Sequence, residues 1–473
     1  MQTLVRTTPI PLILVALVYI ALITFQPSLQ LWPKHIVWFT DRQRLLELVL
    51  LGFILVHAIG TGHLKEHTIL ASKHIQIGLL MLIVFAIFSI TLAYAPRHAL
   101  TEFSMFAALG LLSLLIANQF KENKTHLIKF FTYAFWVSIL LYMLSFYTGY
   151  ITATIVKNPL KWPFPFTGFT NIRSFNQYQL WGIGLLLLPL ICFELKKSTR
   201  ILLHIALIAW WVLLFYSASR GVLIAWLIGA SITILVYQKT AWPFLKLQLA
   251  YLISGFSSYY VLFKFIPKMY GSLLVTNTVI RETTNDRLAL WNQAILMIKT
   301  YPIFGVGPMH YAWFNKTNGH PHNSILQIAA EWGLPATAII LTMVIYAFYY
   351  WFKKFSPNQV QGKSTLDKNL SVILFFTMIT NTAYSMVDGV IVMPISQVLM
   401  FTMIGLMLGQ YVSSDNIVRA SHQSRLRPWI AGILLITLAW STYPEIKQGL
   451  SGDRKGFSMG HTAIGPRFWR ETK

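Results

Sequence analysis

Long apolar runs recur along almost the whole chain, and they constrain its fold more than any other feature. Each is long enough to cross about 30 Å of hydrocarbon as a helix of about 20 residues. None shows the alternation of apolar and polar residues that a transmembrane β-strand needs. Only 11% of the residues are charged, whereas a soluble domain carries about 25%. The sequence therefore predicts an all-α polytopic integral membrane protein.

The apolar runs divide the chain into about 12 or 13 predicted transmembrane helices. They form an N-terminal bundle over residues 1–265 and a C-terminal group over 324–446, with a polar segment over 266–323 between them and a short basic tail over 447–473. The first run lacks a small-residue cleavage site, so we expect a retained anchor rather than a cleaved signal peptide. The predicted spans are residues 9–25, 45–60, 75–94, 103–117, 128–147, 178–195, 201–217, 221–237, 245–265, 324–352, 370–386, 390–411 and 428–444.

The basic residues predict how the chain is oriented. The formal net charge is +23, and charge spread over membrane loops favours orientation and contact with lipid headgroups over nucleic-acid binding. Four clusters fall on one side if the spans alternate, and the excess of Lys and Arg makes that side the cytoplasm. The loop over 150–177 and the polar segment then lie outside. The clusters are Lys121, Lys124 and Lys129; Lys196, Lys197 and Arg200; Lys353, Lys354, Lys363 and Lys368; and Arg419, Arg425 and Arg427.

The polar segment is expected to be ordered and to hold the functional site. Residues 286–299 repeat apolar side chains at helical spacing, which predicts an amphipathic helix lying on the outer membrane surface. Pro and Gly in residues 302–307 (PIFGVG) then predict a turn. The expected apolar face of the helix consists of Leu288, Trp291, Ile295 and Ile298.

Three arginines are candidates for anion binding. Arg220 lies between two apolar spans, where a charged side chain is costly and usually has a partner. Its guanidinium fork suits a phosphate, although snorkelling towards the headgroups is an equally good interpretation. Arg287 and Arg281 lie at or near the start of the surface helix, whose N-terminus favours anions. A solvated surface charge is the simpler interpretation of Arg281.

Two histidines, His320 and His322, precede the span that begins at residue 324. They have no cysteine and few acidic residues nearby, which makes a zinc site improbable, and we expect no metal or other cofactor. A neutral imidazole at a helix start can instead take a proton from a hydroxyl. Asn323 is expected to orient it or to bind sugar hydroxyls. The single cysteine, Cys192, excludes an internal disulfide.

A second polar stretch, residues 164–179, interleaves amides and aromatics around one arginine. Arg173, Asn176 and Gln177 are its candidates for binding a glycan or an acceptor. A polar loop with an aromatic belt is an equally good interpretation of the same residues.

Several short motifs resemble the O-antigen ligase and O-antigen polymerase superfamily. His322-Asn323 followed at a fixed distance by Gly333 resembles its signature, although Ala336 stands where the family has Gly, Thr or Tyr. Arg287 followed four residues later by Trp291 also fits. So do the turn over 302–307, the Ser219-Arg220-Gly221 junction and the large outer loop between late spans.

The resemblance implies a function. Family members transfer a glycan from an undecaprenyl-diphosphate carrier to an acceptor hydroxyl at the periplasmic face of the bacterial inner membrane, with inversion and without metal. His322 would be the general base, and Arg220, Arg287 and the weaker candidate Arg281 would hold the diphosphate. His320 would bind glycan or acceptor. The most similar activity is ligation of O-antigen to lipid A-core.

Other functions remain open on the sequence alone. An O-antigen polymerase and a protein O-oligosaccharyltransferase acting on pilin-type acceptors share the same motifs. The chain ends soon after its last predicted span, which favours a ligase, since the protein-modifying enzymes often have a larger C-terminal part. A transporter or flippase for a lipid-linked anion is the non-enzymatic alternative. It would need polar residues along the spans, and few are present: Glu47, Glu102, Glu331 and Asp388.

Overall fold

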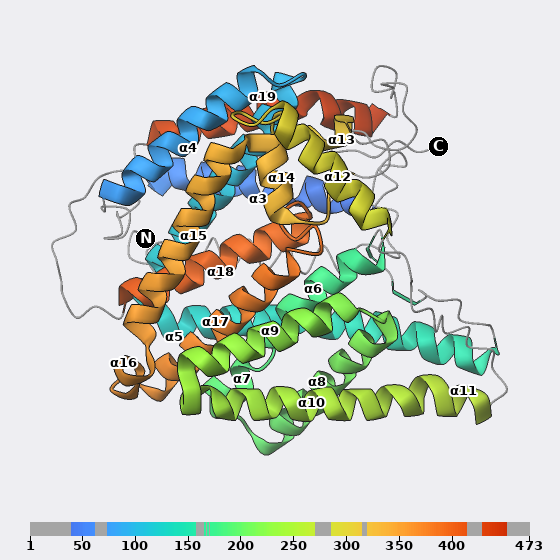
Figure 1. The fold of residues 1–473 in the computed structure, drawn as a ribbon. Coiled ribbons are helices and arrows are strands. Elements are labelled where there is room, and N and C mark those ends of the chain that lie inside the picture. The colour runs from blue at the N-terminus through green and yellow to red at the C-terminus, as the bar shows by residue number, and fades with distance from the viewer. Residues whose placement is uncertain are drawn as a thin grey trace.

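The computed structural model describes residues 39–61, 73–157, 165–166, 168–169, 171–269, 285–314, 319–413 and 428–451. Across these residues the chain is helical and forms no β-strand. Ten stretches among them are long and apolar enough to cross a membrane, which confirms the predicted all-α membrane fold (Figure 1). The predicted span at 9–25, the tail beyond 451, the fourth basic cluster and Arg281 lie outside the described residues.

The described helices are, in chain order, α3 (Phe39–Thr61), α4 (Lys73–Thr91), α5 (Pro96–Ile155), α6 (Ile172–Leu185), α7 (Leu188–Cys192), α8 (Lys197–Ser217), α9 (Arg220–Tyr237), α10 (Trp242–Tyr260), α11 (Ile266–Met269), α12 (Asn285–Thr300), α13 (Tyr311–Phe314), α14 (Ser324–Trp332), α15 (Leu334–Phe355), α16 (Pro357–Gln361), α17 (Thr365–Tyr384), α18 (Pro394–Ser413) and α19 (Pro428–Ser451). A 3₁₀ turn over Gln238–Ala241 and a π turn over Val261–Phe265 flank α10.

Two predicted boundaries were wrong. The spans expected at 103–117 and 128–147 belong to one helical element, α5, in which Asn123 alone leaves helical geometry (φ −151°, ψ 51°). Both halves are long enough to span, so the expected loop is reduced to a kink. The run at 324–352 is two helices instead of one. Gly333 lies between them at φ +84°, and the proline in the first turn of α15 has no N–H with which to continue α14.

The turn over residues 302–307 is present as predicted, and it fixes the end of α14. Val306 N–H donates to the Ala330 carbonyl (2.8 Å) and Gly307 N–H to the Glu331 carbonyl (2.9 Å). These carbonyls end a helix and have no partner inside it. A Cβ at Gly305 or Gly333 would overlap backbone of the facing segment. Only glycine therefore allows this approach, and the turn holds α14 where its first residues can enter the site.

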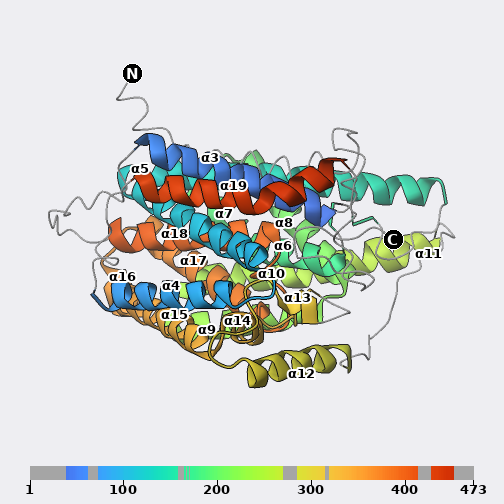
Figure 2. The same cartoon turned by 90° about the horizontal axis from the view of Figure 1, so that it is seen from above.

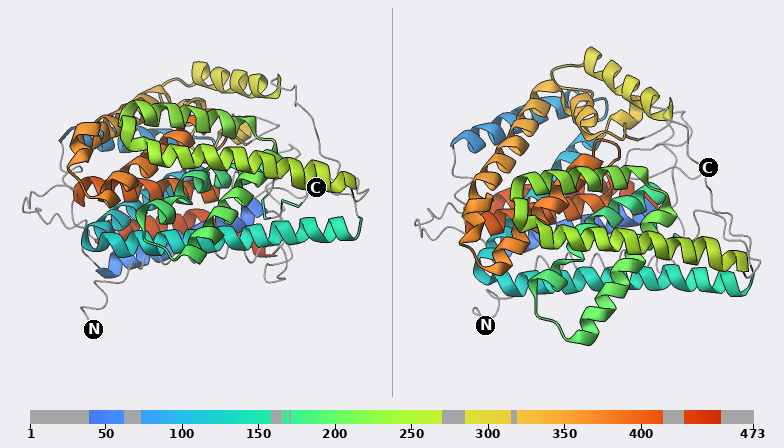
Figure 3. Two further views of the ribbon diagram at one scale, coloured as in Figure 1. Left: turned by 90° about the horizontal axis from the view of Figure 1, so that it is seen from below. Right: turned by 60° about the horizontal axis from the view of Figure 1, so that its bottom comes forward.

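α12 lies at the periphery and packs on α14 (Figures 2 and 3). The helix is present as predicted, and it also has a packed face that the sequence analysis did not predict. Leu290, Ala294 and Met297 are buried, whereas two of the expected apolar-face residues, Leu288 and Ile295, are 52% and 39% exposed. The helix is apolar on several sides, and the small Ala294 permits the closest approach to Ala330, which belongs to the same buried cluster. Packing on α14 therefore selects this face.

Two of the predicted basic clusters, the first and the third, meet at the end of the bundle where α16 lies in Figure 1, and the first also lies next to the second. Lys124 forms an ion pair with Asp367 at the start of α17, and its charge interacts with that of Lys363. Lys129 lies 5.6 Å from the centre of the Phe193 ring, next to the second cluster. This is the arrangement that the topology prediction requires for these three clusters.

Candidate functional site

The other end of the bundle is a meeting point of helix ends. α6, α9 and α14 each begin there with a side-chain cap: Asn171 accepts from Ser174 N–H, Ser219 from Val222 N–H and Asn323 from Leu326 N–H. α17 ends at the same place, and residues 385–393, the Asp388 loop, lead from it to α18. Polar side chains at helix ends are therefore brought together from distant parts of the sequence.

His322 lies at the centre of this group, between a carboxylate and a guanidinium. Its Nδ1 is 3.3 Å from Asp388 Oδ1, and its Nε2 is 3.4 Å from Arg173 Nη1. The residue is 7% exposed and has φ +54°, a left-handed conformation that costs energy outside glycine. A proton on Nδ1 directed at Asp388 leaves the lone pair on Nε2, where Arg173 lies and where a substrate hydroxyl would take its place. Nε2 is then the atom that can accept a proton from a substrate hydroxyl.

Asp388 is the main residue that sequence analysis missed. Its Oδ1 accepts from Gln177 Nε2 (3.1 Å) and from Gly389 N–H (2.7 Å), and its Oδ2 accepts from the Tyr384 hydroxyl (2.8 Å). Burial alone would raise the pKa of the Asp388 carboxyl, but His322 and the hydrogen bonds from Tyr384 and Gly389 hold its pKa at about 2. The signal in the sequence was a lone aspartate between two apolar runs.

Arg287 and the start of α9, which carries Arg220, lie near the same aspartate through Tyr384. A Cβ placed on Gly221 would lie 3.1 Å from the Tyr384 ring, so the start of α9, where Arg220 is exposed, adjoins this tyrosine. The Tyr384 phenol also interacts with the Ser219 hydroxyl and with the charge of Arg287. Four residues thus surround Tyr384 and Asp388 in the structure: His322, Arg173, Arg287 and Ser219.

α12 is held directly against residues 320–322, the histidine segment. Trp291 Nε1 donates to the Pro321 carbonyl (3.0 Å), and Arg287 stands one turn earlier on α12. The spacing of these two residues in the motif therefore has a structural role, since the tryptophan anchors the helix that presents the arginine.

The remaining candidates are His320, Asn323 and Asn176. His320 Nδ1 accepts from His322 N–H (3.3 Å), and its ring lies 4.1 Å from that of His322. Asn323 uses its oxygen for the helix cap and donates its amide to the Met386 carbonyl (3.1 Å). Asn176 is buried, with no partner for Oδ1 among the described residues. Contacts of these residues with a glycan stay predictions. So does the absence of a metal, although no three described His, Cys, Asp or Glu side chains group as a metal site.

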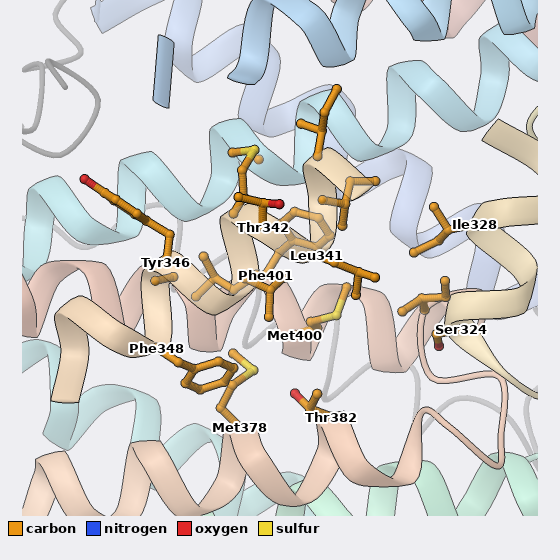
Figure 4. A pocket seen from close by; sticks show the side chains of 18 of the residues that line it. Ser324, Ile328, Leu341, Thr342, Tyr346, Phe348, Met378, Thr382, Met400 and Phe401 are labelled. Atoms are coloured by element: carbon orange, nitrogen blue, oxygen red, sulfur yellow. The ribbon is translucent and has the colours of Figure 1, made fainter. Parts of the chain in front are cut away.

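A large apolar cavity lies beside the site. Its volume is about 1990 Å³, and it is lined by residues of α4, α5, α14, α15, α17 and α18. Figure 4 shows apolar side chains around it, including Leu341, Phe348, Met378 and Met400, with Ser324 and Thr382 among them. Its wall extends from Ser324 beside the site to the other end of the bundle.

The fold and the site together define a multi-pass helical membrane protein with a cluster of histidine, arginine and carboxylate at one end of its bundle. A family model described as O-antigen ligase matches residues 205–341, which include Arg220, Arg287 and His322. The match confirms the resemblance to the O-antigen ligase and polymerase superfamily. Arg173 and Asp388 lie outside the matched residues. None of the curated proteins compared with this chain matches it.

Proposed function

We propose that this protein transfers a glycan from an undecaprenyl-diphosphate carrier to an acceptor hydroxyl, most specifically O-antigen to lipid A-core, at the periplasmic face of the inner membrane. The observation that carries the proposal is the placement of His322 between Asp388 and Arg173, with Arg287 and the start of α9 beside Tyr384. A base and several fixed cations in one place suit the departure of a diphosphate.

The reaction follows from this placement. The acceptor oxygen attacks the anomeric carbon of the donor sugar while the bond from that carbon to the diphosphate oxygen breaks. His322 Nε2 takes the hydroxyl proton, and Asp388 stabilises the imidazolium that forms. Arg220 and Arg287 stabilise the negative charge that develops on the leaving diphosphate. Attack opposite the leaving group inverts the configuration of the anomeric carbon.

The apolar cavity supports a lipid-linked substrate. A long isoprenoid chain needs an apolar path, and Ile228 and Ile232 of α9, two and three turns beyond Arg220, line this cavity. A carrier whose diphosphate lies at Arg220 therefore has an apolar route along the same helix. A soluble nucleotide-linked sugar has no long apolar chain that could occupy this cavity.

The deciding experiment supplies purified protein in liposomes with an undecaprenyl-diphosphate glycan and, in turn, lipid A-core, a pilin-type protein or no second acceptor. Labelled lipid A-core supports the ligase. Labelled protein or a lengthened glycan on the carrier would identify the oligosaccharyltransferase or the polymerase instead. Movement of the donor across the bilayer without transfer would identify a flippase.

Asp388→Asn is expected to lower kcat about 10²-fold, because the imidazolium loses its charged partner. The pKa of Asp388 is lowered to about 2, so its contribution to stability is present above the unfolded pKa of about 3.9 and is lost as pH falls through about 2. The carboxylate thus stays charged from pH 5 to 9. A kcat–pH profile measures the loss, and Asp367→Asn at the opposite end is the matched control. Equal activity in both variants would remove Asp388 from the mechanism.

Ala347→Trp is expected to raise KM for the donor about tenfold with little change in kcat, because the indole fills the cavity and removes binding that substrate and transition state share. Ala347 lines the cavity. Tyr349→Trp is the control, since Tyr349 is 56% exposed on the same helix and does not line the cavity. Steady-state kinetics in liposomes would show the difference, and indistinguishable KM values would place the carrier chain elsewhere.

A further inference from the structure

The first described helix reaches the loop that carries Asp388. Arg44 of α3 donates from Nη2 to the Val392 carbonyl (2.7 Å), a contact between residues 348 positions apart. Its Nη1 donates to Gln397 Oε1 (2.5 Å), and Gln397 Nε2 donates to the Ile391 carbonyl (2.8 Å). The carbonyls of Val392 and Ile391, two consecutive residues of the Asp388 loop, are therefore held by Arg44 and Gln397. We call these two side chains the clamp.

The geometry of Arg44 indicates that it is directed at this loop. Arg44 and Glu47 are 3% and 1% exposed and form an ion pair of 2.6 Å. A buried pair contributes little net stability compared with apolar residues of similar size. A pair selected for mutual attraction would be bidentate, yet Arg44 Nε and Glu47 Oε1 have no hydrogen-bond partner among the described residues. The guanidinium fork faces the loop, and Glu47 balances its charge.

Few contacts separate the clamp from His322, the proposed general base. Val392 and Met393 donate their N–H groups to the Gly389 carbonyl (3.1 and 3.2 Å), and Gly389 follows Asp388 directly. A Cβ at Gly389 would overlap the ring of His320, so the loop backbone lies against the histidine segment. The 3.3 Å distance between His322 Nδ1 and Asp388 Oδ1 is already beyond the usual range for N–H···O bonds. A further displacement of a few tenths of an ångström would therefore break it.

We propose that Arg44 is a positioning residue, which holds the Asp388 loop where Asp388 can orient His322. This inference rests on the proposed function, because it assigns Arg44 a part in the same reaction. The printed contacts of Arg44 are with Glu47, Gln397 and Val392, so it would act on His322 through the loop. Lysine would not replace it, since a single ammonium lacks the planar fork that reaches two acceptors.

Two measurements on Arg44→Met test the proposal, with Arg42→Met as the matched control two residues away, where the guanidinium lies over the Phe39 ring. Hydrogen exchange of the full-length protein without substrate should become faster at Val392 and Met393 in Arg44→Met only. kcat should fall by about 10- to 100-fold, with KM for the donor nearly unchanged, and Arg44→Lys should recover little of it. Unchanged exchange at these amides would overturn the proposal.

A double-mutant cycle decides whether Arg44 acts through Asp388. Arg44→Met combined with Asp388→Asn should be no slower than Asp388→Asn alone, because the loop then has no carboxylate to position. Losses that multiply would show an unrelated role and overturn the proposal. Should Arg44→Met fail to fold, Gln397→Met removes the other half of the clamp and enters the same cycle. Wild-type activity in Asp388→Asn would refute the proposed mechanism instead, while hydrogen exchange would still report on the clamp.

Discussion

His322→Ala is expected to lower kcat for glycan transfer by about 10²- to 10⁴-fold, the usual contribution of a general base. The imidazole of His322 has Nδ1 against the Asp388 carboxylate and Nε2 towards the site, and alanine has no group that could accept the proton of the acceptor hydroxyl. Transfer from purified lipid-linked donor in liposomes measures the effect. The protein should remain folded in the membrane, because the cap of α14 is supplied by Asn323.

The control for His322 is His204→Gln. His204 contacts Tyr251 on helices away from the site, so this variant should keep its activity. Wild-type-like transfer by His322→Ala would remove the general base from the mechanism, and loss of activity in both variants would point to a damaged bundle.

Arg220→Ala and Arg287→Ala are each expected to lower kcat/KM for the donor about 10²- to 10³-fold, because each removes a fixed cation from the leaving diphosphate. Lysine at either position should restore only part of the rate, since it cannot bind two phosphate oxygens at once. Arg287→Ala is expected to leave α12 in place, because Trp291 anchors that helix through the Pro321 carbonyl.

Arg281→Ala is the matched comparison for the two arginines. It removes one positive charge, as the other two variants do, and it lies in the same polar segment as Arg287; we expect a smaller effect. Equal losses in all three variants would mean that overall basic charge attracts the donor and that position is unimportant. A salt titration separates the two cases, because long-range attraction is screened by salt and close contacts much less.

Much of the fold was accessible from the sequence because membrane helices must satisfy their own backbone. Apolar length alone predicted α3, α4, α8 and α9. The boundaries at Asn123 and Gly333 were not accessible. One depends on a single non-helical residue inside a continuous helix, the other on a glycine fitted against a distant turn. The packed face of α12 was likewise decided by α14.

The site was predicted in part. His322, Arg287 and Arg173 were singled out from local pattern, and the structure brings them together, although their roles stay proposals. Asp388 was noticed only as one of four acidic residues in or near the spans, and its position between two apolar runs does not show which residues it contacts. Its importance lies in contacts with Gln177 and His322, which are 211 and 66 positions away. Arg44 was missed for the same reason.

The assembly of the site from helix ends limits how enzymes of this kind can be recombined. A chimaera that exchanges only residues 205–341, the part matched by the family model, would separate His322 from the Asp388 loop and from Arg44 of α3, which lie outside that part. Residues 39–61, 171–185 and 385–397 would have to move with it.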